Sequence, residues 1–320
     1  MNALVTGGAG FIGSNLVDEL LARGHTVRVL DNFSTGKREN LGSVLDRIDL
    51  IEGDIRSYHL VQQAVEGVEV VFHQAALPSV PRSINDPITS NEVNVGGTLN
   101  VLEASRMAGV QRVVYASSSS VYGDRPELPK HEGMAPNPLS PYAVSKLTGE
   151  HYCRVYARIY GLTTVALRYF NVFGPRQDPN SQYSAVIPRF VSLIRQGRPP
   201  TIFGDGEQSR DFTYVTNVVR ANLLAATADC EGGLVLNCAC GERTTLNEIV
   251  RLVGRYAERS VEPIYAEPRV GDVRHSVAAV ELAREKIGYE ATVSLEEGLS
   301  RIVSGDEAST TVPEQVPQRV

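Results

Sequence analysis

The first thirteen residues constrain the fold of this chain more than any other stretch. Residues 3–5 form a short apolar run, which is typical of a parallel strand covered on both faces. Gly7, Gly10 and Gly13 follow with the spacing G-x-x-G-x-x-G. The pattern predicts a strand, a turn and a helix start: Gly7 allows the bend, Gly10 lets a pyrophosphate approach, and Gly13 lets the helix pack closely. A structural turn without a ligand fits the same residues.

A second apolar strand, Thr26 to Leu30, ends in Asp31. A carboxylate at this distance from the glycine turn can accept hydrogen bonds from an adenosine ribose. Its negative charge would repel a 2'-phosphate, which favours NAD over NADP as the cofactor. Asp31 could instead begin a turn and contact no ligand.

Strand and helix patterns alternate through the first half of the chain. Strands are expected at 2–6, 26–31, 49–53, 69–73 and 112–117, and helices from residue 11, near residue 61 and over 88–108. The alternation predicts an α/β fold, a Rossmann-type doubly wound parallel sheet with helices on both faces. Ligands of such a sheet bind beyond the carboxyl ends of its strands.

Polar and small residues follow two of these strands. Asp54 follows the third strand and could bond an adenine. Gln74, Ala75 and Ala76 follow the fourth strand and are small enough for a cofactor to approach closely. Asn94 lies in the long predicted helix, either as a core-facing amide that holds a water or a backbone kink, or as a surface amide.

The pattern changes after residue 171, where proline- and glycine-rich segments replace the regular alternation. We predict an NAD-binding domain over 1–171, with a return to its sheet near 234–258. Residues 172–320 are expected to form mainly a smaller, interleaved C-terminal substrate domain.

Composition excludes several classes of protein. The net charge of −6 argues against bulk nucleic-acid binding. No apolar stretch approaches the ~20 residues of a membrane span, and the N-terminus lacks the basic and apolar regions of a signal peptide, so a cytoplasmic protein is expected. The four cysteines are irregularly spaced and predict buried thiols and no metal site.

Ser118, Tyr142 and Lys146 form the most informative polar group. Ser118 ends the fifth predicted strand, and the other two lie in Ser-Pro-Tyr-Ala-Val-Ser-Lys. Ser140 can cap a helix there and Pro141 suits its first turn, so Tyr142 and Lys146 should share one helical face. An ammonium beside a phenol lowers the pKa of the tyrosine from about 10 toward neutrality, which makes a usable base. Tyr-x-x-x-Lys alone is usually structural; with a serine-rich strand end and a dinucleotide turn it predicts catalysis.

The chain resembles the extended short-chain dehydrogenases/reductases of the NAD-dependent epimerase/dehydratase family, over nearly its whole length. The motifs that carry the resemblance are Thr-Gly-Gly-Ala-Gly-Phe-Ile-Gly at 6–13, Asp31-Asn32, Ser-Ser-Ser-Ser-Val-Tyr-Gly at 117–123, Tyr142 with Lys146, and Leu-Arg-Tyr-Phe-Asn-Val-Phe-Gly-Pro-Arg at 167–176. Within the family, the chain is most similar to UDP-N-acetylglucosamine and UDP-glucose 4-epimerases.

The resemblance implies a redox-neutral reaction on a UDP-hexose with tightly bound NAD. Tyr142 is expected to take the proton of the sugar 4'-hydroxyl while C4 gives hydride to NAD; the 4-keto sugar then turns over and takes the hydride back on its other face. Ser118 would bond the same oxygen and relay its proton, and Ser119 would assist it.

The resemblance also implies two sets of binding residues. The cofactor set is Gly7, Gly10, Phe11, Ile12, Asp31, Asn32, Thr35, Gly36, Asp54, Ile55, Gln74, Ala75, Ala76, Asn94, Tyr142, Lys146 and Tyr169. The substrate set is Ser79, Ser118, Ser119, Tyr142, Asn171, Ala185, Val186, Arg210, Arg269, Asp272 and Ser276. In the second set, guanidinium groups suit diphosphate oxygens, although each arginine alone could form an ordinary surface ion pair.

Residue types separate the sister activities. Dehydratases of the family carry an Asp/Glu pair, and related decarboxylases a Glu, where this chain has Ser118, Ser119 and Ser120, so the resemblance favours epimerisation. Ser276 falls where epimerases restricted to non-acetylated sugars have a bulky tyrosine. Room for a 2-N-acetyl group favours UDP-N-acetylglucosamine and UDP-N-acetylgalactosamine, alongside UDP-glucose and UDP-galactose.

Two alternatives stay open. The enzyme could be a UDP-glucuronate 4-epimerase, because the sequence offers no clean test for a C6 carboxylate in the pocket. A non-catalytic NAD-binding scaffold is the alternative outside enzymes, and the intact Ser118, Tyr142 and Lys146 argue against it. The resemblance further implies a homodimer formed through the helices near 88–108 and 142–160.

Overall fold

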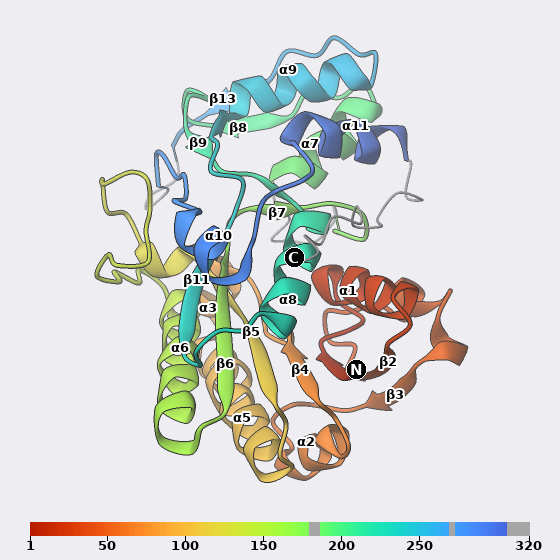
Figure 1. The fold of residues 1–320 in the computed structure, drawn as a ribbon. Coiled ribbons are helices and arrows are strands. Elements are labelled where there is room, and N and C mark those ends of the chain that lie inside the picture. Colours follow the sequence, from red (N-terminus) through yellow and green to blue (C-terminus); the bar gives the residue numbers. More distant parts are fainter. Residues whose placement is uncertain (179–185, 269–272, 306–320) are drawn as a thin grey trace, which may run out of the picture.

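The computed structural model describes residues 1–178, 186–268 and 273–305. Its main feature is a seven-stranded parallel sheet with the strand order β11-β6-β5-β4-β1-β2-β3 (Figure 1). The strands are β1 (Asn2–Thr6), β2 (Thr26–Asp31), β3 (Asp49–Glu52), β4 (Val70–His73), β5 (Arg112–Ser118), β6 (Thr163–Tyr169) and β11 (Leu234–Cys238). The predicted Rossmann-type fold is therefore confirmed.

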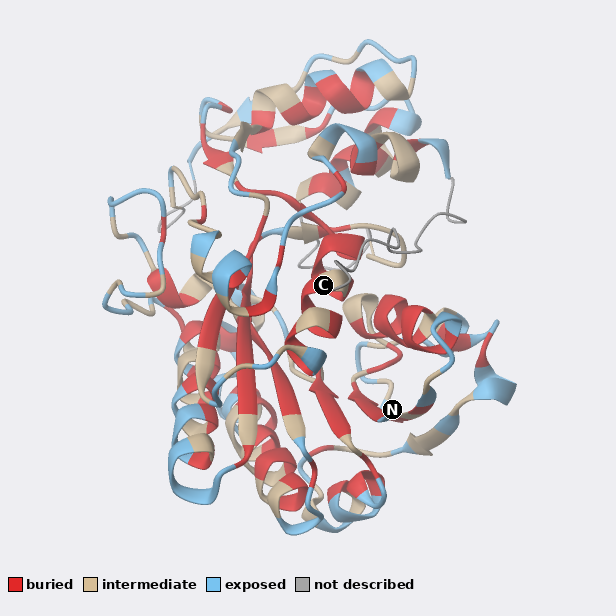
Figure 2. Ribbon diagram, viewed as in Figure 1, coloured by how far each residue is buried: buried red, intermediate tan, exposed pale blue. Residues whose placement is uncertain are grey.

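Helices cover both faces of this sheet. One face carries α1 (Phe11–Ala22), α8 (Val215–Thr227) and α10 (Glu281–Ile287), and the other carries α2 (Tyr58–Val65), α5 (Gly97–Met107) and α6 (Pro141–Tyr160). The alternation of side chains along β1 explains why both faces are apolar. Ala3 and Val5 pack with α1, whereas Leu4 packs with α2 and α5. Figure 2 shows the central strands as mostly buried.

The strand order reverses direction at β1. From β1 the chain proceeds to β2 and β3 on one side of the sheet, and to β4, β5 and β6 on the other. Connections leave the neighbouring strands β1 and β4 in opposite directions, which opens a crevice beyond their carboxyl ends. This crevice is where the predicted ligand residues converge.

The long helix predicted over 88–108 is interrupted. The structure has α4 (Pro87–Asn91), a π-helical turn over Glu92–Gly96, and then α5. Thr98 Oγ1 donates a hydrogen bond to the carbonyl of Asn94 at 2.6 Å, and such side-chain bonding competes with the helical ladder. Asn94 is 1% exposed, so the core-facing alternative applies and the surface alternative is wrong.

Short strands and three helices lie beyond one end of the sheet (Figure 1). The strands are β7 (Val172–Phe173), β8 (Thr201–Phe203), β9 (Ser209–Arg210), β10 (Thr213–Tyr214), β12 (Thr244–Thr245) and β13 (Ile264–Ala266), and the helices are α7 (Val186–Arg195), α9 (Leu246–Tyr256) and α11 (Leu295–Ser304). These helices share a buried apolar group of their own. The predicted return of the chain to the main sheet is β11, beside β6; the division into two domains stays a prediction.

The remaining elements are helical turns that connect the strands: α3 (Val80–Asn85), and the 3₁₀ turns over Arg38–Leu41, Leu45–Arg47 and Ser119–Tyr122. Among the described residues, no helix combines the length and apolar character needed to span a membrane.

Candidate active site

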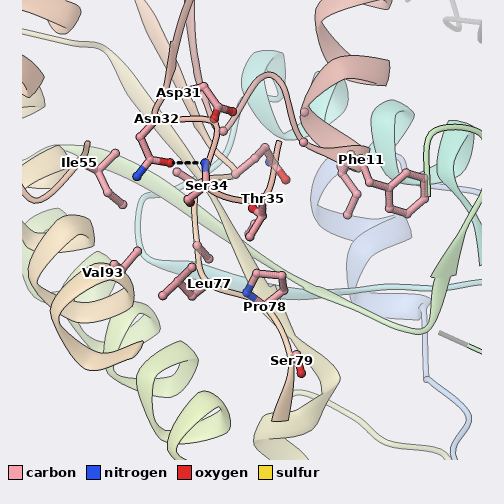
Figure 3. Close-up of a pocket in the computed structure, with 18 of the residues that line it drawn as sticks. Phe11, Asp31, Asn32, Ser34, Thr35, Ile55, Leu77, Pro78, Ser79 and Val93 are labelled. Carbon is pink, nitrogen blue, oxygen red and sulfur yellow. Dashed lines mark hydrogen bonds between the residues drawn. The ribbon is translucent and has the colours of Figure 1, made fainter. Parts of the chain in front are cut away.

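A cavity of about 780 Å³ opens beyond the carboxyl ends of β1, β2 and β4 (Figure 3). Most of the predicted cofactor residues line it: Gly7, Gly10, Phe11, Ile12, Asp31, Asn32, Thr35, Asp54, Ile55, Gln74, Ala75, Ala76, Tyr142, Lys146 and Tyr169. Ser79, from the predicted substrate set, lines it as well. In Figure 3, Asp31 and Asn32 lie at one end of the cavity and Ser79 lies at the other.

The glycine turn has the predicted close packing. Gly7 has a φ of +71°, and a Cβ at this residue would lie 2.7 Å from the nitrogen of Ala75. A Cβ on Gly13 would lie 2.1 Å from the carbonyl oxygen of Gly7. Gly10 precedes α1 and offers no side chain to cap it, so the N–H groups of the first helical turn can serve a bound phosphate.

Asp31 has the turn contacts of one role that the sequence left open and lies where the other, ribose binding, requires. Its carboxylate accepts hydrogen bonds from the backbone nitrogens of Ala9 at 2.9 Å and Phe33 at 2.8 Å, so it shapes the turn. It also lines the cavity, where its remaining lone pairs can accept further hydrogen bonds. Burial raises the pKa of Asp31, and the two N–H donors act in the opposite direction.

Side chains at the predicted adenosine end hold each other. Asn32 Oδ1 accepts from Ser34 N at 3.1 Å, the bond drawn in Figure 3, and Asn32 Nδ2 donates to Asp54 at 2.9 Å. Asp54 also forms an ion pair with Arg56, and hydrogen bonds from Arg56 lower the pKa of Asp54. Gly36 does not line the cavity; a Cβ there would lie 2.8 Å from the backbone of Ala9, so Gly36 packs the loop against the glycine turn.

Ser118 and Tyr142 meet at the edge of the cavity. Helix α6 starts as predicted, with Ser140 Oγ accepting from Ala143 N at 3.1 Å and Pro141 in the first turn. Ser118, the last residue of β5, accepts a hydrogen bond from Ser120 N at 3.2 Å. The hydroxyl proton of Ser118 is then available for the phenol oxygen of Tyr142, and this hydrogen bond lowers the pKa of Tyr142.

Lys146 does not act on Tyr142 as the spacing predicted. Its ammonium lies 5.9 Å from the centre of the Tyr142 ring and donates to the carbonyl of Ala116 at 2.8 Å. Burial outweighs the Ser118 hydrogen bond and raises the pKa of Tyr142. Burial also lowers the pKa of Lys146 to about 8. The predicted fall of the tyrosine pKa is therefore wrong for these residues alone, because desolvation of the phenolate exceeds the effect of the distant ammonium.

A buried ion pair supports this wall of the cavity. Arg168 and Glu150 are 2% and 1% exposed, and two hydrogen bonds of 2.8 and 2.7 Å join them. Glu150 also accepts from Ser117 Oγ at 2.5 Å, and Ser117 lines the cavity. Tyr142, Lys146 and Glu150 are spaced by four residues on α6, a repeat that predicts Glu150 on the face of Tyr142 but does not predict its partner Arg168 on β6.

Other predicted substrate residues form a separate group along β9. Arg210 donates to the carbonyls of Ser209 and Arg274, at 3.0 and 3.1 Å. Ser276 N donates to the carbonyl of Ser209 at 3.0 Å, and Asn171 Nδ2 donates to the carbonyl of Asp211 at 3.0 Å. The structure thus brings Asn171, Arg210 and Ser276 together, although they do not line the cavity.

Several predicted residues remain apart from the cavity or outside the description. Ser119 begins the 3₁₀ turn after Ser118, Val186 begins α7, and the Asn94 side chain is engaged by Leu77 and Ser145. Ala185, Arg269 and Asp272 lie outside the described residues.

Sequence reasoning missed part of the lining. The charged and polar lining residues that were not among the predicted site residues include Ser34, Lys37, Asn40, Arg56, Arg82, Thr89, Arg176, Gln177 and Asp178. Ser34 and Lys37 lie on the loop after β2, directly beside the predicted Asn32 and Thr35, so that proximity was an available signal. Arg176 ends the motif at 167–176, and Gln177 and Asp178 follow it directly, so that motif was a second signal. No motif marked Asn40, Arg56 and Arg82, which reach the cavity from loops and helices whose course depends on tertiary packing.

Comparisons with known proteins agree with this geometry. The model of the NAD dependent epimerase/dehydratase family matches residues 3–239. The UDP-glucose 4-epimerase of Mycolicibacterium smegmatis is 42% identical over 307 residues, which are 95% of this chain and 97% of that protein.

Two solved structures are similar over nearly their whole length. The UDP-glucose 4-epimerase of Thermotoga maritima, crystallised with UDP-glucose, has a TM-score of 0.91 at 40% identity, with 97% of this chain and 99% of that chain covered. The UDP-N-acetylglucosamine 4-epimerase of Methanobrevibacter ruminantium, in complex with UDP-N-acetylmuramic acid, has a TM-score of 0.91 at 40% identity, with 96% and 98% covered.

Proposed function

Because the chain belongs to the NAD-dependent epimerase/dehydratase family, we propose that it is a UDP-sugar 4-epimerase that interconverts UDP-N-acetylglucosamine and UDP-N-acetylgalactosamine, and also UDP-glucose and UDP-galactose. The observation that carries this proposal is the Ser118–Tyr142 hydrogen bond at a cavity lined by the dinucleotide residues. The similar proteins named above act on or bind UDP-sugars, which supports the same substrate class.

The cavity fits NAD. The uncapped first turn of α1 suits the pyrophosphate, and the buried carboxylate of Asp31 suits an adenosine ribose without a 2'-phosphate. Asn32, Asp54 and Ile55 would surround the adenine. When bound, NAD supplies the reversible two-electron oxidation that allows C4 to change configuration.

Ser118 and Tyr142 would share the proton of the 4'-hydroxyl. Tyr142 removes the proton as a general base and returns it as the acid once the configuration has changed. Ser118 would accept the hydroxyl proton of the sugar with its second lone pair and pass its own proton to the phenol oxygen of Tyr142, so that the proton is relayed. The hydrogen bond from Lys146 to the carbonyl of Ala116 would hold a positive charge beside Ser118 and Tyr142.

The β9 group would hold the nucleotide and set sugar specificity. Arg210 is proposed to bind the diphosphate, with Asn171 on the sugar side. Ser276 is half-buried and small, which would leave room for the 2-N-acetyl group. Ser79, Ser119 and Val186 are proposed to complete the substrate contacts, together with Ala185, Arg269 and Asp272.

The test is to incubate purified protein separately with UDP-N-acetylglucosamine, UDP-glucose and UDP-glucuronate, first without and then with added NAD. NMR of the anomeric protons follows the appearance of each galacto epimer. Product from the acetylated and neutral sugars supports the proposal, and product from the glucuronate alone selects the UDP-glucuronate 4-epimerase instead. No product in any tube after NAD is added contradicts epimerisation and leaves the scaffold alternative.

We also propose the homodimer expected through the helices near 88–108 and 142–160. Its contact would use the outer face of α6 and, from the first region, α4, together with the adjoining α3. Large apolar side chains are exposed there: Ile84 by 61%, Ile88 by 72%, Val144 by 49%, Val155 by 43% and Ile159 by 66%. Exposed apolar side chains gathered on adjoining helices are typical of an interface. Light scattering at micromolar concentration should give a dimer, and an Ile159→Glu variant should give a monomer; a wild-type monomer contradicts the proposal.

A further inference from the structure

Ser83 holds the backbone of Tyr142 from a different helix. Ser83 lies in α3, is 1% exposed, and its Oγ accepts a hydrogen bond from Tyr142 N at 3.0 Å. The same hydroxyl donates to the carbonyl of Val80 at 2.8 Å, which orients its lone pair. Tyr142 is the second residue of α6, so its N–H has no acceptor within the helix. Ser83 is the partner that this buried donor requires.

The carbonyl of Tyr142 is held by a second route. Ser145 Oγ donates to Tyr142 O at 2.8 Å and accepts from Asn94 Nδ2 at 3.1 Å. The Asn94 amide also accepts from Leu77 N at 2.7 Å and donates to Leu77 O at 3.1 Å. Both peptide groups of Tyr142 are thus linked to the segment 77–83.

This segment is also a wall of the cavity. Leu77, Pro78, Ser79 and Arg82 line it. Ser79 has a φ of +97°, a strained conformation for a non-glycine residue that persists only where the surroundings impose it. Ser79 Oγ accepts from Arg82 N at 3.3 Å and so begins α3. The strained residue therefore stands between the cavity and the helix that carries Ser83.

We propose that Ser83 is a positioning residue for Tyr142, through which the segment 77–83 couples the occupied cavity to the catalytic phenol. The inference rests on the proposed function, since it takes Tyr142 as the base. A base must lie within hydrogen-bond reach of the proton that it removes, and a displacement of about 1 Å can lower the rate by up to ~100-fold. Without the Ser83 hydroxyl, the N–H of Tyr142 is buried without a partner and α6 moves to satisfy it.

The test compares Ser83→Ala with Ser90→Ala. Ser90 is a matched control because it is also 1% exposed, lies in the adjacent α4, and donates only to the carbonyl of Asp86. We expect Ser83→Ala to lower kcat by about 10- to 100-fold with KM changed less than about twofold, and Ser90→Ala to leave both unchanged. Equal effects of the two substitutions, or a rise in KM alone, would overturn the proposal.

Ser83→Cys gives an independent measurement should the alanine variant fold poorly. Sulfur is a weaker acceptor of similar size, so kcat should fall by less than in Ser83→Ala. The acid limb of the kcat–pH profile should also move to higher pH in both variants, because a displaced Tyr142 loses the Ser118 hydrogen bond that lowers its pKa. Unchanged kcat and an unchanged acid limb in Ser83→Cys would contradict the positioning role.

A titration separates this inference from the proposed function. The tyrosinate absorbance of each protein, minus that of its Tyr142→Phe counterpart, reports the ionisation of Tyr142 without any turnover. Ser83→Ala should raise its midpoint relative to wild type, even if wild type epimerises no sugar and the proposed function fails. An unchanged midpoint, with wild type active, would remove the inference and leave the proposed function intact.

Discussion

Removal of one partner of the Arg168–Glu150 pair should destabilise the protein strongly. Both side chains are almost fully buried, at 2% and 1% exposure, so neither charge has access to water. In Arg168→Met the Glu150 carboxylate keeps the hydrogen bond from Ser117 but loses two charged donors. An uncompensated buried charge of this kind costs about 3–5 kcal/mol of unfolding free energy.

The double variant Glu150→Gln/Arg168→Met should recover most of that loss. It removes both charges, keeps similar volumes, and leaves Ser117 an amide oxygen to which it can donate. A buried pair replaced as a whole costs little compared with a broken one. The exposed Arg255–Glu296 pair, at 49% and 57% exposure, is the control, and Arg255→Met should leave the free energy of unfolding nearly unchanged.

Urea unfolding followed by circular dichroism measures these differences, with the slope m checked for each variant. If Arg168→Met cost as little as Arg255→Met, or if the double variant were less stable than Arg168→Met, the burial argument would be refuted. If Arg168→Met kept its stability but bound less NAD, the pair would serve mainly to shape the cavity wall.

Four further predictions concern the site. Tyr142→Phe should abolish NMR-detected epimerisation while the NAD content measured after denaturation stays within about twofold of wild type, and retained turnover would exclude Tyr142 as the base. Gly7→Ala should lose bound NAD, because the new Cβ would meet Ala75 N at 2.7 Å at a φ of +71°; undiminished NAD content would contradict this. Turnover should fall as pH rises through about 8, where Lys146 loses its charge, and a kcat profile flat to pH 10 would count against a role for that charge. Ser276→Tyr should remove activity on the acetylated sugars and spare UDP-glucose, and unchanged activity on both would end the pocket argument.

The sheet could be predicted from the sequence because its signals are local. Apolar runs of four to seven residues that end at a glycine turn, at Asp31 or at Ser118 predict buried parallel strands, and the structure places each within about one residue of its expected bounds. The cofactor residues follow from the same logic, since they sit at strand ends that the fold brings to one edge.

The rest of the site depends on contacts that no local pattern records. The π-helical turn at Asn94 forms where Thr98 bonds back to the chain, and Thr98 is in turn 2.9 Å from the buried His73 on β4. Arg82 lines the cavity from α3, a short helix that no motif marked. Such positions are set by tertiary packing. A sequence pattern predicts whether these residues lie in a helix or a loop, but not that the helix or loop reaches the cavity.

The electrostatics of Tyr142 show most clearly what spacing can and cannot predict. A separation of four residues places Tyr142 and Lys146 on one face of α6, and the structure confirms this. Spacing does not give the partner of the ammonium, which is the carbonyl of Ala116 on a neighbouring strand. With the charge drawn toward β5, burial decides the outcome and the pKa of Tyr142 rises, so the protein alone favours the neutral phenol. The Ser118 hydrogen bond opposes that rise only in part. A second positive charge in the cavity, such as the ring of oxidised NAD, would act in the same direction as the Ser118 hydrogen bond and favour the phenolate.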